Sequence, residues 1–336
     1  MTVLGLARAT SDPVTDALLE AIAGCGSELG IATCPVGSAT DEAAVDITLY
    51  VGLPLWYANL LSAPRRSRRI AWFGEMLPRP AARGGADTQL TRGLAALGVR
   101  VARPILGPLT RGQLPGPLAL WREEVASANA RLVNLGHALW SAEMVDHVVV
   151  TSRDRGRVLG DHGVDAKVVP FGYHEAEAGP LVAPDVDERD IAVTVIGRGL
   201  RMRSSRRARI LARLLPAIER LGPVVLADGV WGTERDAILR RTRIVLDVQN
   251  AAGNFGGLRF LTALAAGAVL VTDTVDDPFP FEPGIDHVEA PVDGLAAAIA
   301  ALLDDEPRRL AMVAAGQARL VGDLAMRCSL ERVLTA

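Results

Sequence analysis

The sequence predicts an α/β fold made of two doubly wound domains that face each other across a cleft. Three observations support this prediction. Short apolar segments alternate with helical patterns along most of the chain, most of these segments are continuously apolar, and one aperiodic break divides them into two groups. Continuously apolar strands are typical of parallel sheets that helices cover on both faces. Repeated strand–helix units of this kind build open twisted sheets.

Ten apolar segments are the expected strands. In the first group they lie at 2–7, 30–34, 46–52, 68–74, 147–152 and 166–172. In the second group they lie at 191–197, 223–229, 243–248 and 268–273. The helical patterns include 12–25, which a cap at Ser11 or Asp12 would start, together with 119–141, 295–303 and 306–320.

The division between the domains falls in the segment 173–190, which is rich in proline, glycine and acidic residues and has no periodicity. We therefore expect a Rossmann-like domain over 1–172, a linker over 173–190 and a second Rossmann-like domain over 191–320. A final helix over 321–336 is expected to pack back on the first domain. Ligands of such sheets bind at the carboxyl ends of the strands, so the loops that follow the strands are the expected location of a site.

The composition is that of a globular protein with a large core, because 49% of the 336 residues are hydrophobic and 22% are charged. The formal net charge of −3 disfavours bulk attraction to nucleic acid or to an anionic membrane. Three widely spaced cysteines, Cys25, Cys34 and Cys328, indicate reduced thiols. No segment has the pattern of a signal peptide or of a membrane-spanning helix, so we expect a cytoplasmic protein.

A glycine-rich turn follows the expected strand 243–248. Gly253, Gly256 and Gly257 build the turn, and a helix is expected to begin at Gly257 or Leu258. The first amides of a helix have no intrahelical partner and carry partial positive charge, so this geometry favours phosphate. The alternative is that the glycines only let the helix pack closely on the sheet.

A cluster of arginines follows the expected strand 191–197, around the start of another helix. Arg198, Arg201, Arg203, Arg206 and Arg207 all lie in this stretch. Guanidinium groups bind a diphosphate through planar, bidentate hydrogen bonds, and we expect one or two of these five to do so. The others would form a solvated helix face. No carboxylate cluster or histidine pair indicates a metal, so arginines and the helix N-terminus would act in place of a metal ion.

The order of these motifs resembles the donor half of GT-B glycosyltransferases. The segment 168–174 (VVPFGYH) matches the family's crossing between domains, Gly197-Arg198 matches a strand that ends in Gly-Arg, and 259–267 (RFLTALAAG) matches a segment that covers the donor. The branch that it resembles most is related to spore-maturation glycosyltransferases, within the retaining, family-4-like group. The resemblance implies an acceptor domain over 1–172 and a donor domain for a nucleoside-diphosphate sugar over 191–320.

The sequence departs from the family at the positions that usually carry two glutamates. Asn254 and Thr262 occupy these positions, where the family contacts the sugar and the ribose of the donor. The family lysine that holds the diphosphate is also missing, since Lys167 precedes the second domain. The resemblance therefore assigns the diphosphate to Arg198, Arg203 or Arg206 and the first amides of the helix. It assigns the ribose and the sugar to Asn254, Thr262 and Asn250.

Five further roles follow from the resemblance or from position along the chain. If the transfer inverts configuration, a base is needed in the first domain, and Glu75 and Asp12 are the candidates. If it retains configuration, the leaving phosphate deprotonates the acceptor. His174 would contact the sugar or shape the crossing, and Trp231 would stack on the nucleobase or cap the core. Asn250 would bind sugar hydroxyls or serve as a turn residue.

These inferences predict a metal-independent glycosyltransferase without a cofactor, whose co-substrate is a nucleoside-diphosphate sugar and whose acceptor is a small molecule. Two alternatives stay open. The first is a non-catalytic relative that binds a sugar nucleotide or a partner protein, which the residues Asn254 and Thr262 favour. The second is a nucleotide-sugar epimerase with the same two-domain architecture. An oxidoreductase is disfavoured, because no G-x-G-x-x-G pattern follows the early strands.

Overall fold

The computed structural model describes residues 2–7, 13–52, 64, 66–73, 144–160, 163–184, 189–197, 200, 206–249, 252–253 and 255–336. The chain divides into two compact units. The first unit contains Met1–Val169 together with Leu330–Ala336, and the second unit contains Pro170–Ser329. The first division lies close to residue 172, where the sequence analysis ends its first domain.

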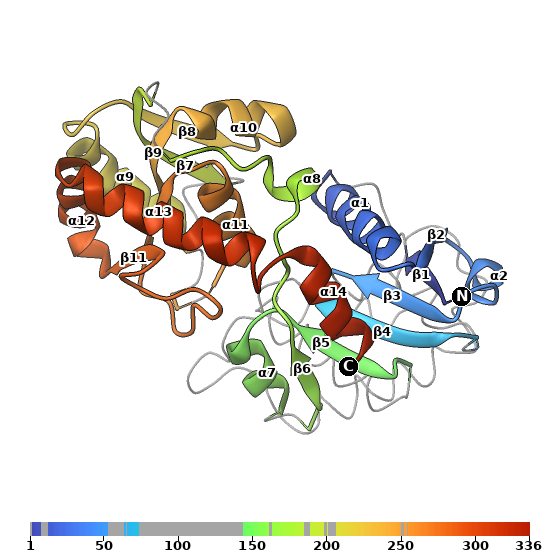
Figure 1. Ribbon diagram of the computed structural model, residues 1–336. Coiled ribbons are helices and arrows are strands. Elements are labelled where there is room, and N and C mark those ends of the chain that lie inside the picture. The colour runs from blue at the N-terminus through green and yellow to red at the C-terminus, as the bar shows by residue number, and fades with distance from the viewer. Residues whose placement is uncertain are drawn as a thin grey trace. The chain divides into compact units, whose positions relative to one another are not determined.

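The first unit is built on a six-stranded parallel sheet of order β2-β1-β3-β4-β5-β6 (Figure 1). Its strands are β1 (Val3–Ala7), β2 (Ala32–Val36), β3 (Ile47–Val51), β4 (Arg68–Phe73), β5 (His147–Val150) and β6 (Ala166–Val168). Its described helices include α1 (Pro13–Glu28), α2 (Ala39–Glu42) and α7 (Arg153–Gly160). The strands lie within two residues of their predicted starts, because buried parallel strands are the strongest pattern in this sequence.

Two arginines on β4 tie other parts of the first unit to its sheet. Arg69, which is 1% exposed, pairs with the buried Glu42 of α2 through Nε at 2.5 Å and Nη2 at 2.6 Å. Arg68 donates to the backbone carbonyls of Leu334 at 3.1 Å and Ala336 at 2.6 Å. The last residues of the chain are thereby fixed to the edge of β4 at which the strand begins.

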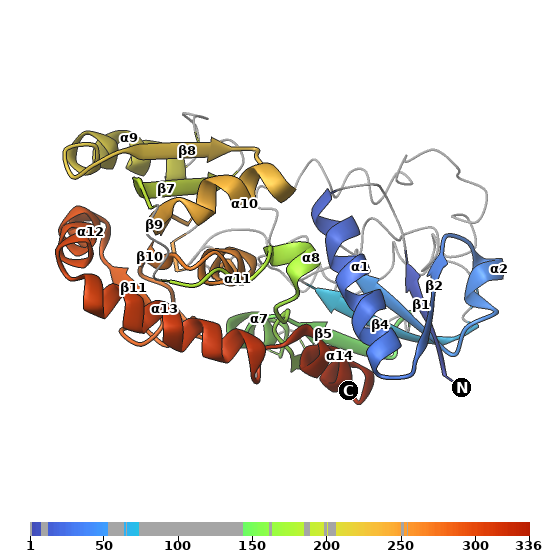
Figure 2. The ribbon, with the colours of Figure 1, turned by 45° about the horizontal axis from the view of Figure 1, so that its top comes forward.

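The second unit is built on a five-stranded parallel sheet of order β11-β10-β9-β7-β8 (Figure 2). Its strands are β7 (Ile191–Gly197), β8 (Val224–Asp228), β9 (Thr242–Asp247), β10 (Val269–Asp273) and β11 (His287–Ala290). Its described helices include α8 (Glu175–Ala178), α9 (Arg206–Ile218), α10 (Gly232–Arg240), α11 (Gly257–Ala265), α12 (Leu295–Asp304) and α13 (Glu306–Val321). Helix α14 (Met326–Leu334) begins in the second unit and ends in the first.

Helices cover both faces of the second sheet. Figures 1 and 2 show α9 and α12 on one face and α10 and α11 on the other. A core of buried aliphatic side chains joins α9, α12 and α13 to the central strands, with Val193, Ile244 and Val269 fully buried among them. The burial of such side chains stabilises each by about 1.5–3 kcal/mol relative to exposure, so this core fixes the strand ends that carry the site.

Two elements were not expected from the sequence. Strand β11 is short, and the one residue of this strand that is buried is the polar His287, so β11 lacks the apolar pattern of the other strands. Helix α8 lies inside the segment predicted as an aperiodic linker, where His174 caps its first turn. The predicted helix over 119–141 lies outside the described residues. Among the residues that the structure describes, no helix combines the length and the hydropathy that a membrane span requires.

Candidate functional site

The strand order of the second sheet reverses at β7. The chain runs from β7 to its neighbour β8 on one side and then crosses to β9 on the other side. The carboxyl ends of β7 and β9 therefore form a topological switch point, where open α/β sheets bind their ligands. Helix α9 begins after β7 with Arg206, and helix α11 begins after β9 with Gly257, so both helix N-termini belong to this edge of the sheet.

Asp247, the last residue of β9, holds one arginine at this edge. Its Oδ1 lies 2.8 Å from Nε of Arg259, and the carboxylate side chain is 1% exposed while that of Arg259 is 22% exposed. Gln249 completes the group, because its Nε2 donates to Asp247 Oδ2 at 2.7 Å and its Oε1 accepts from Arg259 Nη2 at 3.0 Å. The guanidinium of Arg259 is thus held in place by the buried side chains of Asp247 and Gln249.

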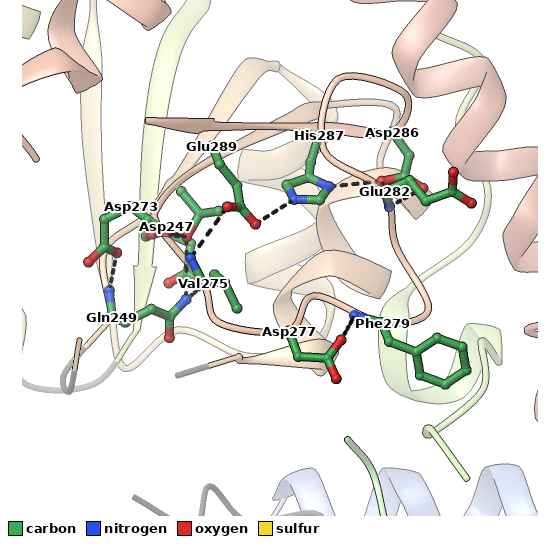
Figure 3. Close-up of polar contacts among 11 residues, drawn as sticks. Asp247, Gln249, Asp273, Val275, Asp277, Phe279, Glu282, Asp286, His287 and Glu289 are labelled. Carbon is green, nitrogen blue, oxygen red and sulfur yellow. Dashed lines mark hydrogen bonds and ion pairs between the residues drawn. The ribbon is translucent and has the colours of Figure 1, made fainter. Parts of the chain in front are cut away.

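Asp273, the last residue of β10, holds a second arginine in the same way. Its Oδ2 lies 2.7 Å from Nη1 of Arg206, whose side chain is 27% exposed. The same Nη1 donates to the backbone carbonyl of Gln249 at 2.7 Å. Asp273 Oδ1 accepts from the backbone N–H of Gln249 at 2.8 Å, a contact drawn in Figure 3. The two carboxylates therefore anchor Gln249 and both partly exposed arginines.

A third arginine, Arg207, lies beneath the surface of the site. It is 3% exposed and donates from Nε to the carbonyl of Val248 at 2.6 Å. Burial lowers the pKa of its guanidinium and the nearby Arg259 cation lowers it further, while Asp247 and Asp273 act in the opposite direction. A side chain at Gly197 would collide with Arg207, so the glycine at the end of β7 leaves room for this cation.

The N-terminus of α11 adds positive charge to the same place. Gly256 is its N-cap and supplies no side-chain cap. A Cβ atom at Gly256 would lie 2.5 Å from Nη2 of Arg259, so the guanidinium folds back over the first turn. A cation at a helix N-terminus is unfavourable unless an anion compensates it. The guanidinium groups of Arg206, Arg207 and Arg259 lie at this edge with the carboxylates of Asp247 and Asp273, and Asp228 also acts on Arg207. The partly exposed guanidinium groups of Arg206 and Arg259, together with the first amides of α11, favour an anionic ligand.

The glycine turn itself is braced by the loop that follows β10. Gly253 has a φ of 78° and forms an isolated parallel bridge with Val275. Its carbonyl accepts from the N–H of Asp276 at 2.9 Å, and a Cβ atom at Gly253 would collide with the Asp276 carboxylate. Gly253 is therefore required both for its positive φ and for the close approach of this loop.

Four residues predicted as diphosphate ligands, Arg206, Gly256, Gly257 and Leu258, lie together at this edge. Thr262, predicted at the ribose, lies one turn further along α11, where it is 4% exposed and donates its hydroxyl hydrogen to the carbonyl of Leu258 at 2.8 Å. Its role as a ribose ligand stays a prediction.

His174 and Trp231 occupy other loops of the second unit. His174 is the N-cap of α8, where its Nδ1 accepts from the N–H of Ala176 at 3.2 Å. Trp231 is the N-cap of α10 and follows the carboxyl end of β8. Their predicted contacts with sugar and nucleobase stay predictions. The other predicted site residues, Asp12, Glu75, Arg198, Arg203, Asn250 and Asn254, lie outside the described residues.

Asp247, Gln249 and Asp273 carry no predicted role, and Arg259 is predicted only as part of the segment 259–267 that covers the donor. A signal was present, since both aspartates end apolar strands, at the edge where sites of this fold lie. What the sequence could not supply is the pairing of these acids with arginines that are 12 and 67 positions away along the chain. Within the ranges that the structure describes, no group of three or more His, Cys, Asp or Glu side chains could hold a metal ion.

Comparison with known proteins gives a family match for the second unit and a shared fold. Residues 189–334 match the model of a family described as glycosyl transferase-like. No curated protein matches by sequence.

Many solved structures resemble this chain, among them three that match the whole of it or most of it. HepE from Anabaena, in complex with UDP and glucose, is 12% identical with a TM-score of 0.62, over 100% of this chain and 99% of that one. An alpha-glucosyltransferase in complex with UDP-glucose and DNA is 10% identical with a TM-score of 0.56, over 100% and 99%. TarM is 10% identical with a TM-score of 0.53, over 86% of this chain and 54% of TarM, so the chain spans about half the length of that protein. At such identities these structures show the shared fold.

Proposed function

We propose that this chain is a glycosyltransferase, which moves a sugar from a nucleoside-diphosphate sugar to a small-molecule acceptor without a metal ion. The match of residues 189–334 to a glycosyl transferase-like family and the fold shared with HepE support this proposal. Because HepE and the alpha-glucosyltransferase were solved with UDP or UDP-glucose, a uridine nucleotide is the first donor to test. Its relation to the spore-maturation branch stays part of this proposal.

One observation carries the proposal. Arg206 and Arg259 are partly exposed, each is fixed by a buried carboxylate, and both lie at the N-terminal turns of helices at the switch point of the second sheet. A diphosphate carries negative charge and pairs of phosphate oxygens that a planar guanidinium can bind through two hydrogen bonds and that helix amides also bind. A bound diphosphate would also compensate the unfavourable position of the Arg259 cation at the N-terminus of α11.

The same arrangement supports a chemical step. Negative charge grows on the β-phosphate as the bond between the sugar and the nucleotide breaks. Arginines that are already held by Asp247 and Asp273 would stabilise that charge without reorganising, which is how preorganised donors lower a barrier. The resemblance to the retaining group leaves deprotonation of the acceptor to the leaving phosphate. If the reaction inverts configuration instead, Glu75 and Asp12 are the proposed bases.

The finer parts of the proposal have their own support. Metal independence rests on guanidinium groups standing where a metal ion would neutralise the diphosphate. The small-molecule acceptor rests on the net charge of −3, which disfavours a polyanionic acceptor. A cytoplasmic location is proposed from the three free cysteines, of which Cys25 is buried.

A second candidate function is a relative that binds a sugar nucleotide without turnover. The observation that favours it is Thr262, whose hydroxyl hydrogen is donated within its own helix. A carboxylate at that position would accept hydrogen bonds from both ribose hydroxyls, worth about 1.5–3 kcal/mol each. Donor binding without that contribution is expected to be weaker than in relatives that have the glutamate.

Calorimetric titration with UDP, GDP, ADP and TDP, followed by the corresponding sugar nucleotides, tests the donor site. We expect one nucleoside diphosphate to bind, and Arg206→Ala to weaken its binding about tenfold or more. Arg209→Ala, on the exposed face of the same helix, is the matched control and should leave the Kd unchanged. Binding of none of the nucleotides would refute the proposal. Slow release of free sugar from the bound donor would support transfer, and binding without turnover on any acceptor would favour the second candidate.

A further inference from the structure

A buried histidine on the unexpected strand β11 connects two acidic side chains. His287 is 0% exposed. Its Nδ1 lies 2.8 Å from Asp286 Oδ1, and its Nε2 lies 3.3 Å from Glu289 Oε1. Figure 3 shows the imidazole between these two carboxylates, beside the loop that leaves β10. Both ring nitrogens face carboxylate oxygens, so a ring that carries both protons donates a hydrogen bond to each side.

Glu289, one of the two acidic partners of His287, connects the imidazole to the glycine turn at Gly253. Glu289 Oε2 accepts from the backbone N–H of Val275 at 3.4 Å. Val275 in turn forms the parallel bridge with Gly253, and the next residue, Asp276, donates its N–H to the Gly253 carbonyl at 2.9 Å. A continuous path of contacts therefore runs from the imidazole through Glu289 and Val275 to the turn that precedes α11.

The Asp286 side holds the far end of the same loop. Asp286 accepts from the backbone N–H of Glu282 through Oδ1 at 3.0 Å and Oδ2 at 3.2 Å. Its Oδ2 also lies 3.2 Å from Nε of Arg319 on α13, whose Nη2 pairs with Glu282 Oε1 at 2.8 Å. The loop between β10 and β11 is thus fastened at Val275 by one carboxylate and at Glu282 by the other, and His287 joins the two.

His287 also contacts the site helix directly. Its ring packs edge-on against Phe260, with the ring centroids 4.9 Å apart. Phe260 is fully buried on α11 and is the residue after Arg259. A shift of the imidazole would therefore be felt at the glycine turn and at the first turn of α11.

We propose that His287 is a positioning residue of the donor site: acting through Glu289 and Val275, it sets the glycine turn at Gly253 and the first amides of α11 against the diphosphate. This inference rests on the proposed function. It adds a residue that touches neither substrate nor reacting atoms, and whose effect is on donor affinity.

Two substitutions of His287 separate the contact at Nδ1 from the contact at Nε2, because the side-chain amides of asparagine and glutamine reach different distances. His287→Asn places an amide N–H₂ near the position of Nδ1 and keeps the bond to Asp286 alone. His287→Gln places it near Nε2 and keeps the bond to Glu289 alone. We expect His287→Asn to raise the Kd for the nucleoside diphosphate and the donor KM about tenfold, with kcat changed less than about threefold. His287→Gln should restore the Kd to within about threefold of the unmodified protein.

A second pair tests the same path from Glu289, whose side chain is 15% exposed and tolerates change better than the buried ring. Glu289→Gln keeps an oxygen that accepts from Val275 N–H and an amide that can donate to a neutral imidazole, so donor affinity should stay near normal. Glu289→Ala removes both contacts and should raise the Kd about as much as His287→Asn. Glu219→Ala, at an exposed position of the second unit, is the control.

The outcomes separate this inference from the proposed function. If the unmodified protein binds no nucleotide, both fail. If it binds and the four variants all keep its Kd, the positioning role of His287 is wrong while the donor site stands. The positioning role also fails if both members of each pair lose affinity equally and in step with a fall in thermal unfolding temperature, since this is the result expected of a purely structural role.

Discussion

Arg259 and Asp247 form an ion pair whose acid is buried at the end of β9 and whose guanidinium reaches over the first turn of α11. The two charged atoms are 2.8 Å apart, and only the arginine is partly exposed. This asymmetry makes the carboxylate a fixed support and the guanidinium a contact surface. Replacement of Asp247 is therefore expected to affect the position of the guanidinium, whereas replacement of Arg259 removes the contact surface itself.

Replacing Arg259 by methionine removes the cation that pairs with the buried carboxylate of Asp247. Breaking a buried pair in this way costs about 3–5 kcal/mol, so we expect the free energy of unfolding to fall by about 3 kcal/mol. The double variant Arg259→Met, Asp247→Asn should recover most of that stability, because no uncompensated charge remains. It should not recover nucleotide binding. Urea unfolding and calorimetry on the three proteins check this, and full recovery of binding would remove Arg259 from the site.

Gly256→Ala tests the close approach of Arg259 to the helix N-terminus. The added Cβ would lie 2.5 Å from Nη2, so the guanidinium must move away from its position. We expect about a tenfold rise in the Kd for nucleoside diphosphate, with a change of unfolding free energy below about 1 kcal/mol. Gly294→Ala is the matched control, since Gly294 is the N-cap of α12 and a Cβ there meets nothing nearer than 3.4 Å. Equal affinities for the two variants would contradict this account.

Thr262→Val tests whether the Thr262 hydroxyl only donates to the carbonyl of Leu258 or also contacts the ribose of the donor. In the structure the hydroxyl hydrogen goes to the carbonyl of Leu258 at 2.8 Å, so we expect the substitution to change the Kd less than about twofold and to cost about 1 kcal/mol of stability. Calorimetric titration of the two proteins decides it. A loss of affinity of tenfold or more would show that the oxygen contacts the ribose, as the resemblance implies.

Glu177 on α8 gives the second unit a pH dependence that can be measured. Burial raises the pKa of its carboxyl to about 7, with Arg235 opposing and Asp236 adding to the rise, and the described residues offer its Oε2 no hydrogen bond. An unfolded glutamate titrates near 4.5. Between these values the folded state holds a proton that the unfolded state loses, so the free energy of unfolding falls as pH rises from about 4.5 to about 7.

Above pH 7 the free energy of unfolding is expected to be lower than at pH 4.5 by about 3 kcal/mol because of Glu177. Glu177→Gln should abolish this decrease and make the protein more stable than the unmodified one at pH 8, with little difference at pH 4.5. Glu175→Gln, at an exposed position of the same helix, should change neither value. Urea unfolding at the two pH values measures both variants, and an unchanged pH slope in Glu177→Gln would show that another group causes it.

Hydrophobic pattern was enough to place most of the fold. The parallel strands from β1 to β10 lie where continuous apolar segments predict them, and the glycine turn before α11 lies where Gly253, Gly256 and Gly257 predict it. Strand β11 could not be found in this way, because His287 and Glu289 interrupt its apolar character and their burial depends on partners elsewhere in the second unit. The pairing of Asp247 with Arg259 is of the same kind. It depends on three-dimensional proximity that neither periodicity nor spacing encodes.

The bonds from Arg68 to the carbonyls of Leu334 and Ala336 have a consequence for biosynthesis. The second unit is one unbroken stretch of chain, whereas the first unit needs residues made at both ends of it. On the ribosome the second unit can complete its sheet while the guanidinium of Arg68 still has no carbonyls to bind. The first unit is therefore the last to be finished, because Leu330–Ala336 join it only after the whole second unit has been made.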